Sequence, residues 1–280
     1  MVKTKTRHTS VKITKYLLLT IFSLLTFIPF LFALFTSLKS IPQFAHNYWT
    51  ISFPIHWQNY VNAGRVVINY IGNSLFVTTI SVLGILCFSV LTAYVFGRYH
   101  FPGKSILFYL IIMLLMVPGV LTLIPAFILM KNLHLLNSRW ALIFSYISGG
   151  QVISIFILRT FIESIPEDLF SAARIDGTNH FQILRYIVVP LTKPVIGTVA
   201  ILNILGIWND YIWPLVVLHD DRLRTITIGL KHFTDTASYG NIDYGGLMAG
   251  YLIGAIPLVI LFMFTMRQFI EGLTAGALKG

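Results

Sequence analysis

The residue of this sequence whose type and setting could carry chemistry is Asp210, a carboxylate inside a long apolar stretch. Trp208, Asn209 and Trp213 surround it, and Pro214 follows. Aromatic faces pack on the C–H surfaces of sugars while Asn and Asp bond hydroxyls, so this group could line a passage for a hydroxyl-rich solute. The alternative is a carboxylate that caps a broken helix end before the proline. The residues alone leave both interpretations open.

Other motifs that could carry chemistry fail on spacing. The segment Gly97–Ser105 resembles a phosphate-binding loop, but five residues instead of four separate its glycines, and it joins two apolar runs. The eight histidines form no close pair on one helical face, and no serine lies in a recognisable nucleophile turn. The single cysteine, Cys87, allows neither an intrachain disulfide nor a multi-cysteine metal site. We therefore expect no catalytic residue, metal or cofactor in this chain, and any ATP would be hydrolysed by another chain.

The composition predicts a membrane protein. Of 280 residues, 56% are hydrophobic and only 11% are charged, and the mean hydropathy is +0.79, far from the balance of soluble proteins. A helix needs roughly 20 apolar residues to cross the hydrocarbon of a bilayer. Six apolar runs are long enough: Tyr16–Leu38, Ile71–Phe96, Ser105–Met130, Trp140–Leu158, Pro194–Leu218 and Tyr244–Met266. We predict an all-α protein with six transmembrane helices in one domain, residues 16–266.

Two of these runs contain residues that modify helices. Pro118 and Pro125 interrupt the third run, and we favour a kink tolerated by neighbouring helices over a break that lines a pathway. Gly246, Gly250 and Gly254 lie four apart in the sixth run. Small residues at this spacing are typical of a tight packing face between helices.

The basic residues orient the chain in the membrane. If the N-terminus is cytoplasmic, 13 of the 20 Lys and Arg residues fall in cytoplasmic segments, as the positive-inside rule requires. Both tails, residues 1–15 and 267–280, and the loop 159–193 are then cytoplasmic, whereas Lys39–Tyr70 and His219–Asp243 lie outside. Because the basic residues lie between apolar runs, the net charge of +10 indicates a lipid bilayer as partner and not nucleic acid.

The segment Ser164–Leu191, within that cytoplasmic loop, is the longest amphipathic stretch of the chain. Ser164 and Glu167 are spaced as a capping box, which predicts a helix over Ile165–Ile175. The dipeptide Asp176-Gly177 then predicts a turn. A short helix followed by a sharp bend is the expected local structure.

A second short helix should follow the bend. Thr178 would cap it, and Pro190 would end it. Ala172, Ala173 and Gly177 are small where long charged side chains would be free to extend, so another protein's backbone could approach closely. The segment then forms a compact knob that suits a docking partner, although an amphipathic loop lying on the bilayer would look similar.

This segment resembles the cytoplasmic signature of permeases of ATP-binding cassette (ABC) importers: Glu-Ala-Ala, three residues, Gly, nine residues, Ile, one residue, Leu-Pro. The positions that agree with the signature are Ala172, Ala173, Gly177, Ile187 and Pro190. Ser171 replaces the signature Glu and Val189 replaces the Leu. An ion pair from that Glu to an ATPase therefore cannot form here, and contact must depend more on shape.

Further similarity narrows the resemblance to carbohydrate importers. The matching stretches are Ala93–Gly103, Ala173–Gly177, Trp208–Leu215 and the C-terminal Gly-Leu-Thr-Ala-Gly-Ala-Leu-Lys-Gly, residues 272–280. The resemblance implies a multi-pass permease of a bacterial cytoplasmic membrane with type I importer architecture, which is not itself an enzyme.

The resemblance also implies partners: a second homologous permease, two cytoplasmic ATPase subunits that hold ATP and Mg²⁺, and an extracytoplasmic sugar-binding protein. The amphipathic knob would sit in a cleft of an ATPase. The residues expected to provide this coupling are Glu167, Ser171, Ala172, Ala173, Arg174, Asp176 and Gly177.

Two alternatives remain open. A secondary carrier driven by an ion gradient would need intramembrane charges, and apart from Asp210 these are missing from the apolar runs. A permease of the same family that imports a non-sugar solute is excluded only by the resemblance.

Overall fold

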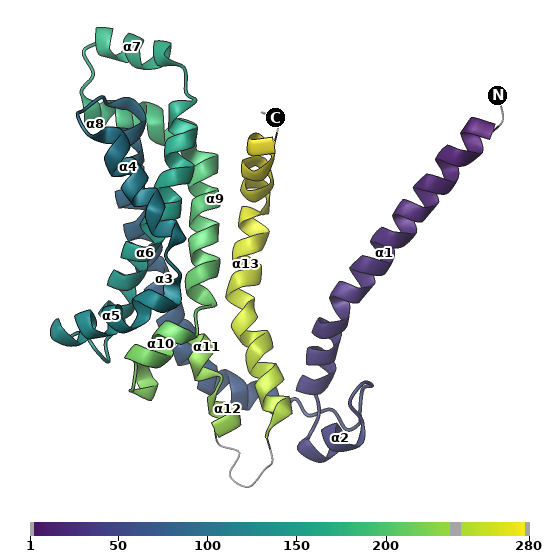
Figure 1. The fold of residues 1–280 in the computed structure, drawn as a ribbon. Coiled ribbons are helices and arrows are strands. Elements are labelled where there is room, and N and C mark those ends of the chain that lie inside the picture. Colours follow the sequence, from purple (N-terminus) through teal and green to yellow (C-terminus); the bar gives the residue numbers. More distant parts are fainter. Residues whose placement is uncertain (1–2, 236–241, 278–280) are drawn as a thin grey trace. The chain divides into compact units, whose positions relative to one another are not determined.

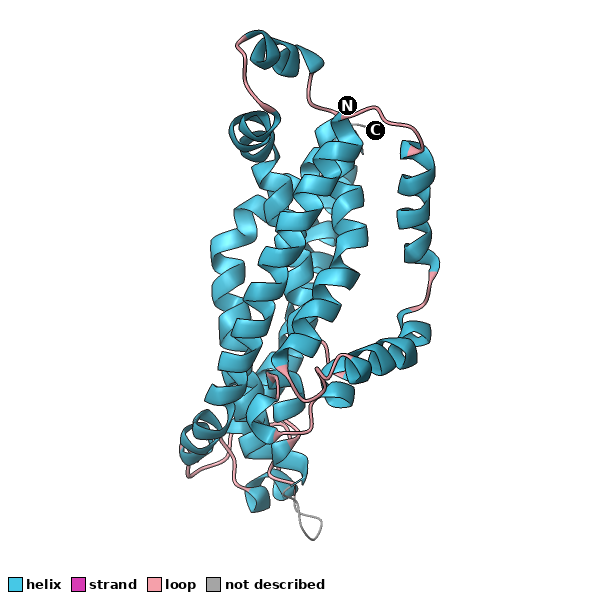
Figure 2. Ribbon diagram, turned by 90° about the vertical axis from the view of Figure 1, so that its left-hand side faces the viewer, coloured by secondary structure: helices cyan, strands magenta, loops and turns pink. Residues whose placement is uncertain are grey.

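The computed structural model describes residues 3–235 and 242–277, and within these ranges every regular element is a helix. Figures 1 and 2 show the helices and the loops that join them. The predicted all-α class is therefore confirmed. The first helix begins within the predicted N-terminal tail and the last one continues into the predicted C-terminal tail, of which residues 278–280 lie outside the described part.

The contacts divide the chain into two compact units. The first consists of the residues up to Val67 together with Leu230–Ala255, and the second consists of Ile68–Gly229 together with the residues from Ile256 onward. Two long helices contribute to both units. They are α3 (Gln58–Arg98) and α13 (Tyr244–Ala277).

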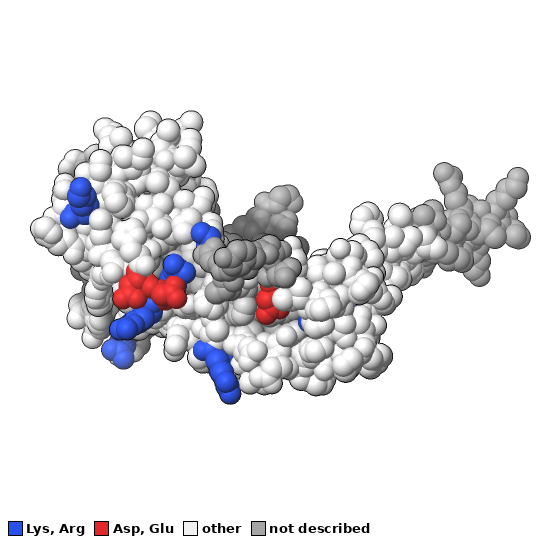
Figure 3. Space-filling view, turned by 90° about the horizontal axis from the view of Figure 1, so that it is seen from below, with Lys and Arg blue, Asp and Glu red and all other residues white. Residues whose placement is uncertain are grey.

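Among the described residues, five helical segments are long and apolar enough to cross a membrane, and a sixth span is reached if one bent pair of helices is counted. The five segments are Lys15–Ser37 within α1 (Lys3–Ser37), α3, α6 (Arg139–Glu163), His180–Trp208, and Tyr244–Met266 within α13. On the face drawn in Figure 3, charged side chains are few and uncharged atoms prevail. The spans agree with five of the predicted apolar runs in position, although not in every boundary.

The third apolar run forms the bent pair. Here α4 (Lys104–Met113), extended by a 3-10 turn, is followed by α5 (Gly119–Asn132), and the two are bent by 102°. The break lies at Val117, whose backbone is extended, because Pro118 disfavours a helical conformation of the residue before it. Pro125 lies inside α5. The kink favoured from the sequence is therefore wrong at Pro118, which breaks the helix.

The fifth apolar run starts earlier and ends earlier than predicted. One helix runs continuously over His180–Trp208, through a π-helical turn. Pro190, expected to end a helix, lies in its interior, because the widened π turn before it accommodates a residue that cannot donate a backbone hydrogen bond. The parts of this region are α8 (His180–Ile183), the π turn Leu184–Val188, α9 (Val189–Trp208) and, after a break, α10 (Ile212–Val217).

The core of the second unit joins α3, α6 and α9 to the short helix α7 (Glu167–Ile175). Its buried side chains include Tyr94 of α3, Leu158 of α6, Phe170 of α7 and Val199 of α9. A separate buried cluster around Trp213 joins α10 to α5, α6 and α11 (Ile226–Gly229). These two clusters hold the second unit together and position the residues that the sequence singled out.

A buried lysine shapes the first unit. The side chain of Lys39 is fully buried, and its ammonium donates to the carbonyl oxygens of Asn47 at 2.6 Å and Tyr48 at 3.0 Å. Desolvation lowers the pKa of this ammonium.

In α13 a Cβ on Gly250 would lie 2.8 Å from Leu230 Cδ2, so the predicted tight packing is confirmed there. The short helices of this unit are α2 (Ile41–His46) and α12 (His232–Asp235).

Candidate functional site

The helix α7 lies across the end of the long helices of the second unit and runs crosswise to them (Figure 1). It begins at Glu167 directly after Pro166, whose fixed φ suits a helix start. Glu167 and Asp168 in its first turn interact favourably with the positive end of the helix dipole. At its other end Gly177 has φ +76°, a left-handed conformation that glycine adopts without a steric penalty. The predicted turn at Asp176-Gly177 is confirmed.

The predicted caps of this region are wrong by one or two residues. The Ser164 hydroxyl donates back to the carbonyl of Phe161 at 2.8 Å, so it does not cap α7, which starts two residues later than expected. The Thr178 hydroxyl donates to the carbonyl of Ala173 at 2.6 Å. The cap of α8 is Asn179, which forms a reciprocal capping box with Gln182. The hydroxyls satisfy carbonyls of the preceding helix ends, which competes with capping.

The two faces of α7 differ in their surroundings. Phe170 and Ala173 are packed into the core, with 2% and 7% of their surface exposed. The small size of Ala173 therefore suits close packing inside its own chain. The other predicted coupling residues are exposed: Glu167, Ser171, Ala172, Arg174, Asp176 and Gly177.

Sequence reasoning missed Ile175, which is 86% exposed at the end of α7. This large apolar side chain is therefore available for contact with another molecule. Its position between Arg174 and Asp176, both of which were singled out for coupling, was the available signal. Open space surrounds the neighbouring Gly177, since no atom lies within 4 Å of the place of a Cβ.

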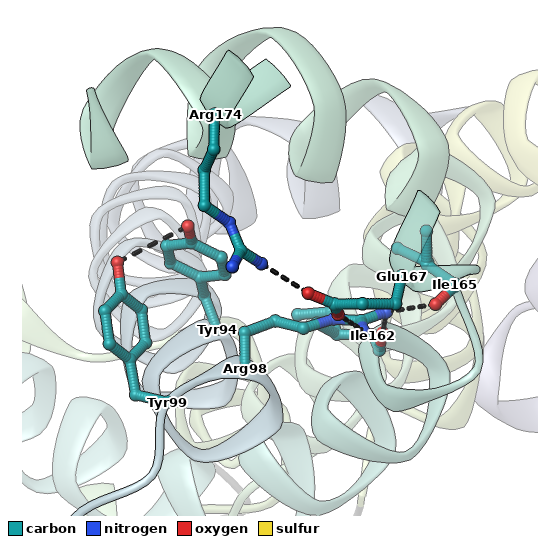
Figure 4. A network of polar contacts seen from close by, with 7 residues as sticks. All are labelled: Tyr94, Arg98, Tyr99, Ile162, Ile165, Glu167 and Arg174. Carbon is teal, nitrogen blue, oxygen red and sulfur yellow. Dashed lines mark hydrogen bonds and ion pairs between the residues drawn. The ribbon is translucent and has the colours of Figure 1, made fainter. Parts of the chain in front are cut away.

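Glu167 is paired within the chain. Its Oε2 lies 3.0 Å from Nη1 of Arg98, and its Oε1 accepts a hydrogen bond from Arg174 (Figure 4). More than half of the side-chain surface of Glu167 and of Arg174 is exposed, so water screens this pair. The Glu167 carboxylate, four residues before Ser171, is thus paired with two arginines of its own chain.

Asp210 lies in the break between α9 and α10, and both its side chain and its backbone carbonyl accept hydrogen bonds. Its Oδ1 accepts from the backbone amides of Ile212 at 3.1 Å and Trp213 at 3.4 Å, the first two residues of α10. Its Oδ2 accepts from the Tyr146 hydroxyl at 2.8 Å, and its backbone carbonyl accepts from Thr227 at 2.6 Å. This geometry supports the structural alternative, a carboxylate that caps a broken helix.

The neighbours of Asp210 have internal roles. Trp208 and Trp213 are buried, and the Trp213 ring nitrogen donates to the carbonyl of Ala141 at 3.4 Å. The Asn209 side chain donates back to the carbonyl of Leu205 at 2.9 Å. Of the four residues that the sequence proposed for a solute passage, Asp210 is the one that lines the groove between α6 and α9.

That groove, of about 300 Å³, lies between α6 and α9. Its polar groups are Ser145, Tyr146, Asn203 and Asp210, none of them recognised from the sequence except the last. A Cβ on Gly149 would meet no atom within 4 Å, so this glycine leaves the groove open. The complete lining is Ser145, Tyr146, Gly149, Gly150, Leu202, Asn203, Gly206, Ile207 and Asp210.

The described residues contain no group of three or more His, Cys, Asp or Glu side chains that could hold a metal ion. The side chains that line the groove carry hydroxyl, amide and carboxylate groups beside apolar surface. Such a lining is suited to binding an uncharged polar solute by hydrogen bonds.

Comparison with known proteins identifies the family. Residues 85–274 match the family model of the binding-protein-dependent transport system inner membrane component. The arabinooligosaccharide transport system permease of Halalkalibacterium halodurans is 38% identical over 75% of this chain and 74% of its own. The multiple sugar-binding transport system permease of Streptococcus mutans is 32% identical over 95% and 96%.

Solved structures agree in fold. A chain of a bacterial ABC transporter that imports the acidic polysaccharide alginate superposes with a TM-score of 0.82 at 24% identity, covering 92% of this chain and 96% of its own. The all-α architecture of an ABC importer permease is therefore confirmed. Since the family model covers more than half of the chain, the chain belongs to the family of binding-protein-dependent transport inner membrane components, the permease subunits of ABC importers in the cytoplasmic membrane.

Proposed function

We propose that this chain is one of two permease subunits of an ATP-driven sugar importer. The observation that carries this proposal is the exposed surface of α7, the helix that contains the start of the importer signature. Ala172 and Ile175 on this helix, and Gly177 in the turn after it, are all exposed. The similar permeases act in transport systems for arabinooligosaccharides and for multiple sugars, which supports a sugar as the solute.

The proposed complex contains a second homologous permease, two cytoplasmic ATPase subunits with ATP and Mg²⁺, and an extracytoplasmic sugar-binding protein. A similar permease structure was obtained in complex with a periplasmic protein bound to an alginate pentasaccharide. Both termini of this chain and α7 are cytoplasmic in the proposal, as the basic residues predict. ATP hydrolysis belongs to the partners, and this chain converts their movement into opening of the pathway.

The exposed surface of α7 enters a cleft of one ATPase. Because Ser171 stands where the signature carboxylate would be and Glu167 is paired with two arginines of this chain, the contact depends mainly on shape. The small surfaces of Ala172 and Gly177 admit a close approach, and Ile175 supplies apolar area. By linkage, binding protein loaded with sugar should favour closure of the ATPase pair.

The solute passes along the groove between α6 and α9. Tyr146, Asn203 and Asp210 offer hydrogen bonds to hydroxyls along its wall. Trp208 and Trp213, by contrast, are buried and are not part of this wall. The proposed pathway therefore keeps Asp210 from the sequence-based set. In place of the two tryptophans it uses the residues of α6 and α9 that line the groove.

Asp210 also distinguishes this proposal from an ion-driven carrier. In proteoliposomes that contain the complete complex and ATP, we expect sugar uptake to continue after ionophores collapse the ion gradients.

Asp210→Asn should retain at least about half of wild-type uptake, because the amide oxygen still caps α10, whereas Asp210→Ala should lose about 1 kcal/mol of stability. Radiolabelled sugar uptake and thermal unfolding of the purified complex measure both. If uptake stops when the ion gradients are collapsed, or if a stably folded Asp210→Asn complex no longer takes up sugar, the ion-driven carrier is favoured.

A further inference from the structure

Arg98, the last residue of α3, contacts every part of the corner where α6 turns into α7 (Figure 4). Its Nη2 donates to the carbonyl oxygens of Ile162, at 2.6 Å, and Ile165. Its Nη1 donates to Glu167 Oε2 at 3.0 Å. Its Cζ lies 4.0 Å from the centre of the Phe170 ring. One guanidinium thus contacts the end of α6, the connecting segment, and both the start and the buried face of α7.

Each of these contacts suits an arginine. The last four carbonyls of a helix lack an intrahelical partner, and a cation beside them complements the negative end of the helix dipole. Hydrogen bonds from a charged donor are stronger than neutral ones, and only 12% of the Arg98 side chain is exposed. The planar fork of the guanidinium holds two acceptors in fixed directions while its face stacks on a ring. A lysine could not reproduce this set of contacts.

The contacts matter for α7 because the helix has few other attachments. Of its nine residues only Phe170 and Ala173 are buried. The second arginine on Glu167, Arg174, is 57% exposed, so its ion pair is screened and weak. Arg98, whose side chain is only 12% exposed, therefore joins α7 to the long helices α3 and α6 through several contacts at once, of which the pair with the half-exposed Glu167 is one.

We propose that Arg98 is a positioning residue of the coupling element, whose guanidinium holds α7 in a fixed orientation to α3 and α6. This proposal rests on the proposed coupling function of α7. A push or pull on α7 is then transmitted to two transmembrane helices at once. Without the guanidinium, α7 would pivot about Phe170, and part of the movement would be lost within this chain.

The test uses the complete complex in lipid nanodiscs and proteoliposomes, with two readouts. Amide hydrogen exchange reports how firmly residues 164–177 are held, and the ratio of sugar taken up to ATP hydrolysed reports coupling. For Arg98→Gln we expect exchange in this segment to rise about threefold or more, as local opening becomes easier. We expect the coupling ratio to fall about tenfold, within the usual range for energetic coupling between sites. Arg98→Lys should lie between Arg98→Gln and wild type.

Arg159→Gln is the matched control. Arg159 is also mostly buried, pairs with Glu163 at 2.7 Å and lies 3.6 Å from the centre of the Phe108 ring, but these contacts stay within α6 and α4. It should keep both readouts near wild type. Wild-type exchange and coupling in Arg98→Gln would overturn the proposal. If that variant does not assemble, wild-type values for both readouts in Arg98→Lys would overturn it. Raised exchange with unchanged coupling would refute the coupling function of α7 itself.

Discussion

Gly177→Trp is expected to uncouple ATP hydrolysis from sugar uptake while leaving the membrane complex assembled. Two physical effects act at this position. The φ of +76° costs any other residue about 1 kcal/mol, and a large ring would occupy the open space that a partner's surface should fill. We expect the sugar taken up per ATP hydrolysed to fall about tenfold or more, measured in proteoliposomes with the purified complex.

Two variants separate bulk from backbone strain. Gly177→Ala carries the same strain with a single methyl group, and we expect it to keep most of the coupling. Gly103→Trp carries the same bulk at φ +80°, also with no atom near the place of its Cβ, in the turn between α3 and α4. It should couple normally. Equal losses in Gly177→Ala and Gly177→Trp would assign the effect to the backbone, and normal coupling in an assembled Gly177→Trp complex would contradict docking at this surface.

The adjacent glycines of α6 are expected to respond in opposite ways to the same substitution. A Cβ on Gly150 would lie 2.5 Å from Ile85 Cδ1 and 2.6 Å from Asn203 Oδ1, so Gly150→Leu must displace the buried Ile85 side chain of α3 and the Asn203 side chain of α9. Overpacking of this kind costs about 3 kcal/mol. We expect a lower unfolding temperature and a reduced yield of assembled complex.

Gly149→Leu is expected to fold, because open space surrounds that position and leucine favours a helix more than glycine does. Its side chain would fill part of the groove of about 300 Å³. Sugar uptake should fall about tenfold while the unfolding temperature stays at or above that of wild type. Normal uptake in this variant would show that the solute does not pass along the groove, and a stable Gly150→Leu complex would contradict the close packing of α3, α6 and α9.

The spans were predictable because hydrophobicity over some twenty residues is a local property. The effect of proline was not. Pro118 breaks its helix, whereas Pro190 lies within a continuous one, because a π turn before Pro190 widens the backbone. Whether a neighbouring turn can relax in this way depends on the tertiary packing around it, which the residue type does not reveal.

The coupling segment was recognised from its spacing, but its contacts were not. Ser164 and Thr178 carry hydroxyls that cap helices in many proteins, yet here both bond carbonyls of the preceding helix ends. Arg98 is 69 residues away from Glu167, and Tyr146 is 64 residues away from Asp210. Pairs so distant in sequence meet only because the helices pack, so the sequence alone could not reveal the partners Arg98 of Glu167 and Tyr146 of Asp210.

The most direct test of docking is a cross-link from the exposed end of α7. The exposed Cys87 is first replaced by Cys87→Ser, and Ile175→Cys then offers one thiol to a short bifunctional reagent in the assembled, active complex. Val120→Cys is the control, since Val120 is also highly exposed but lies on α5. The account predicts a product that joins this chain to the ATPase from Ile175→Cys and none from Val120→Cys. An active complex with no ATPase product from Ile175→Cys would contradict it.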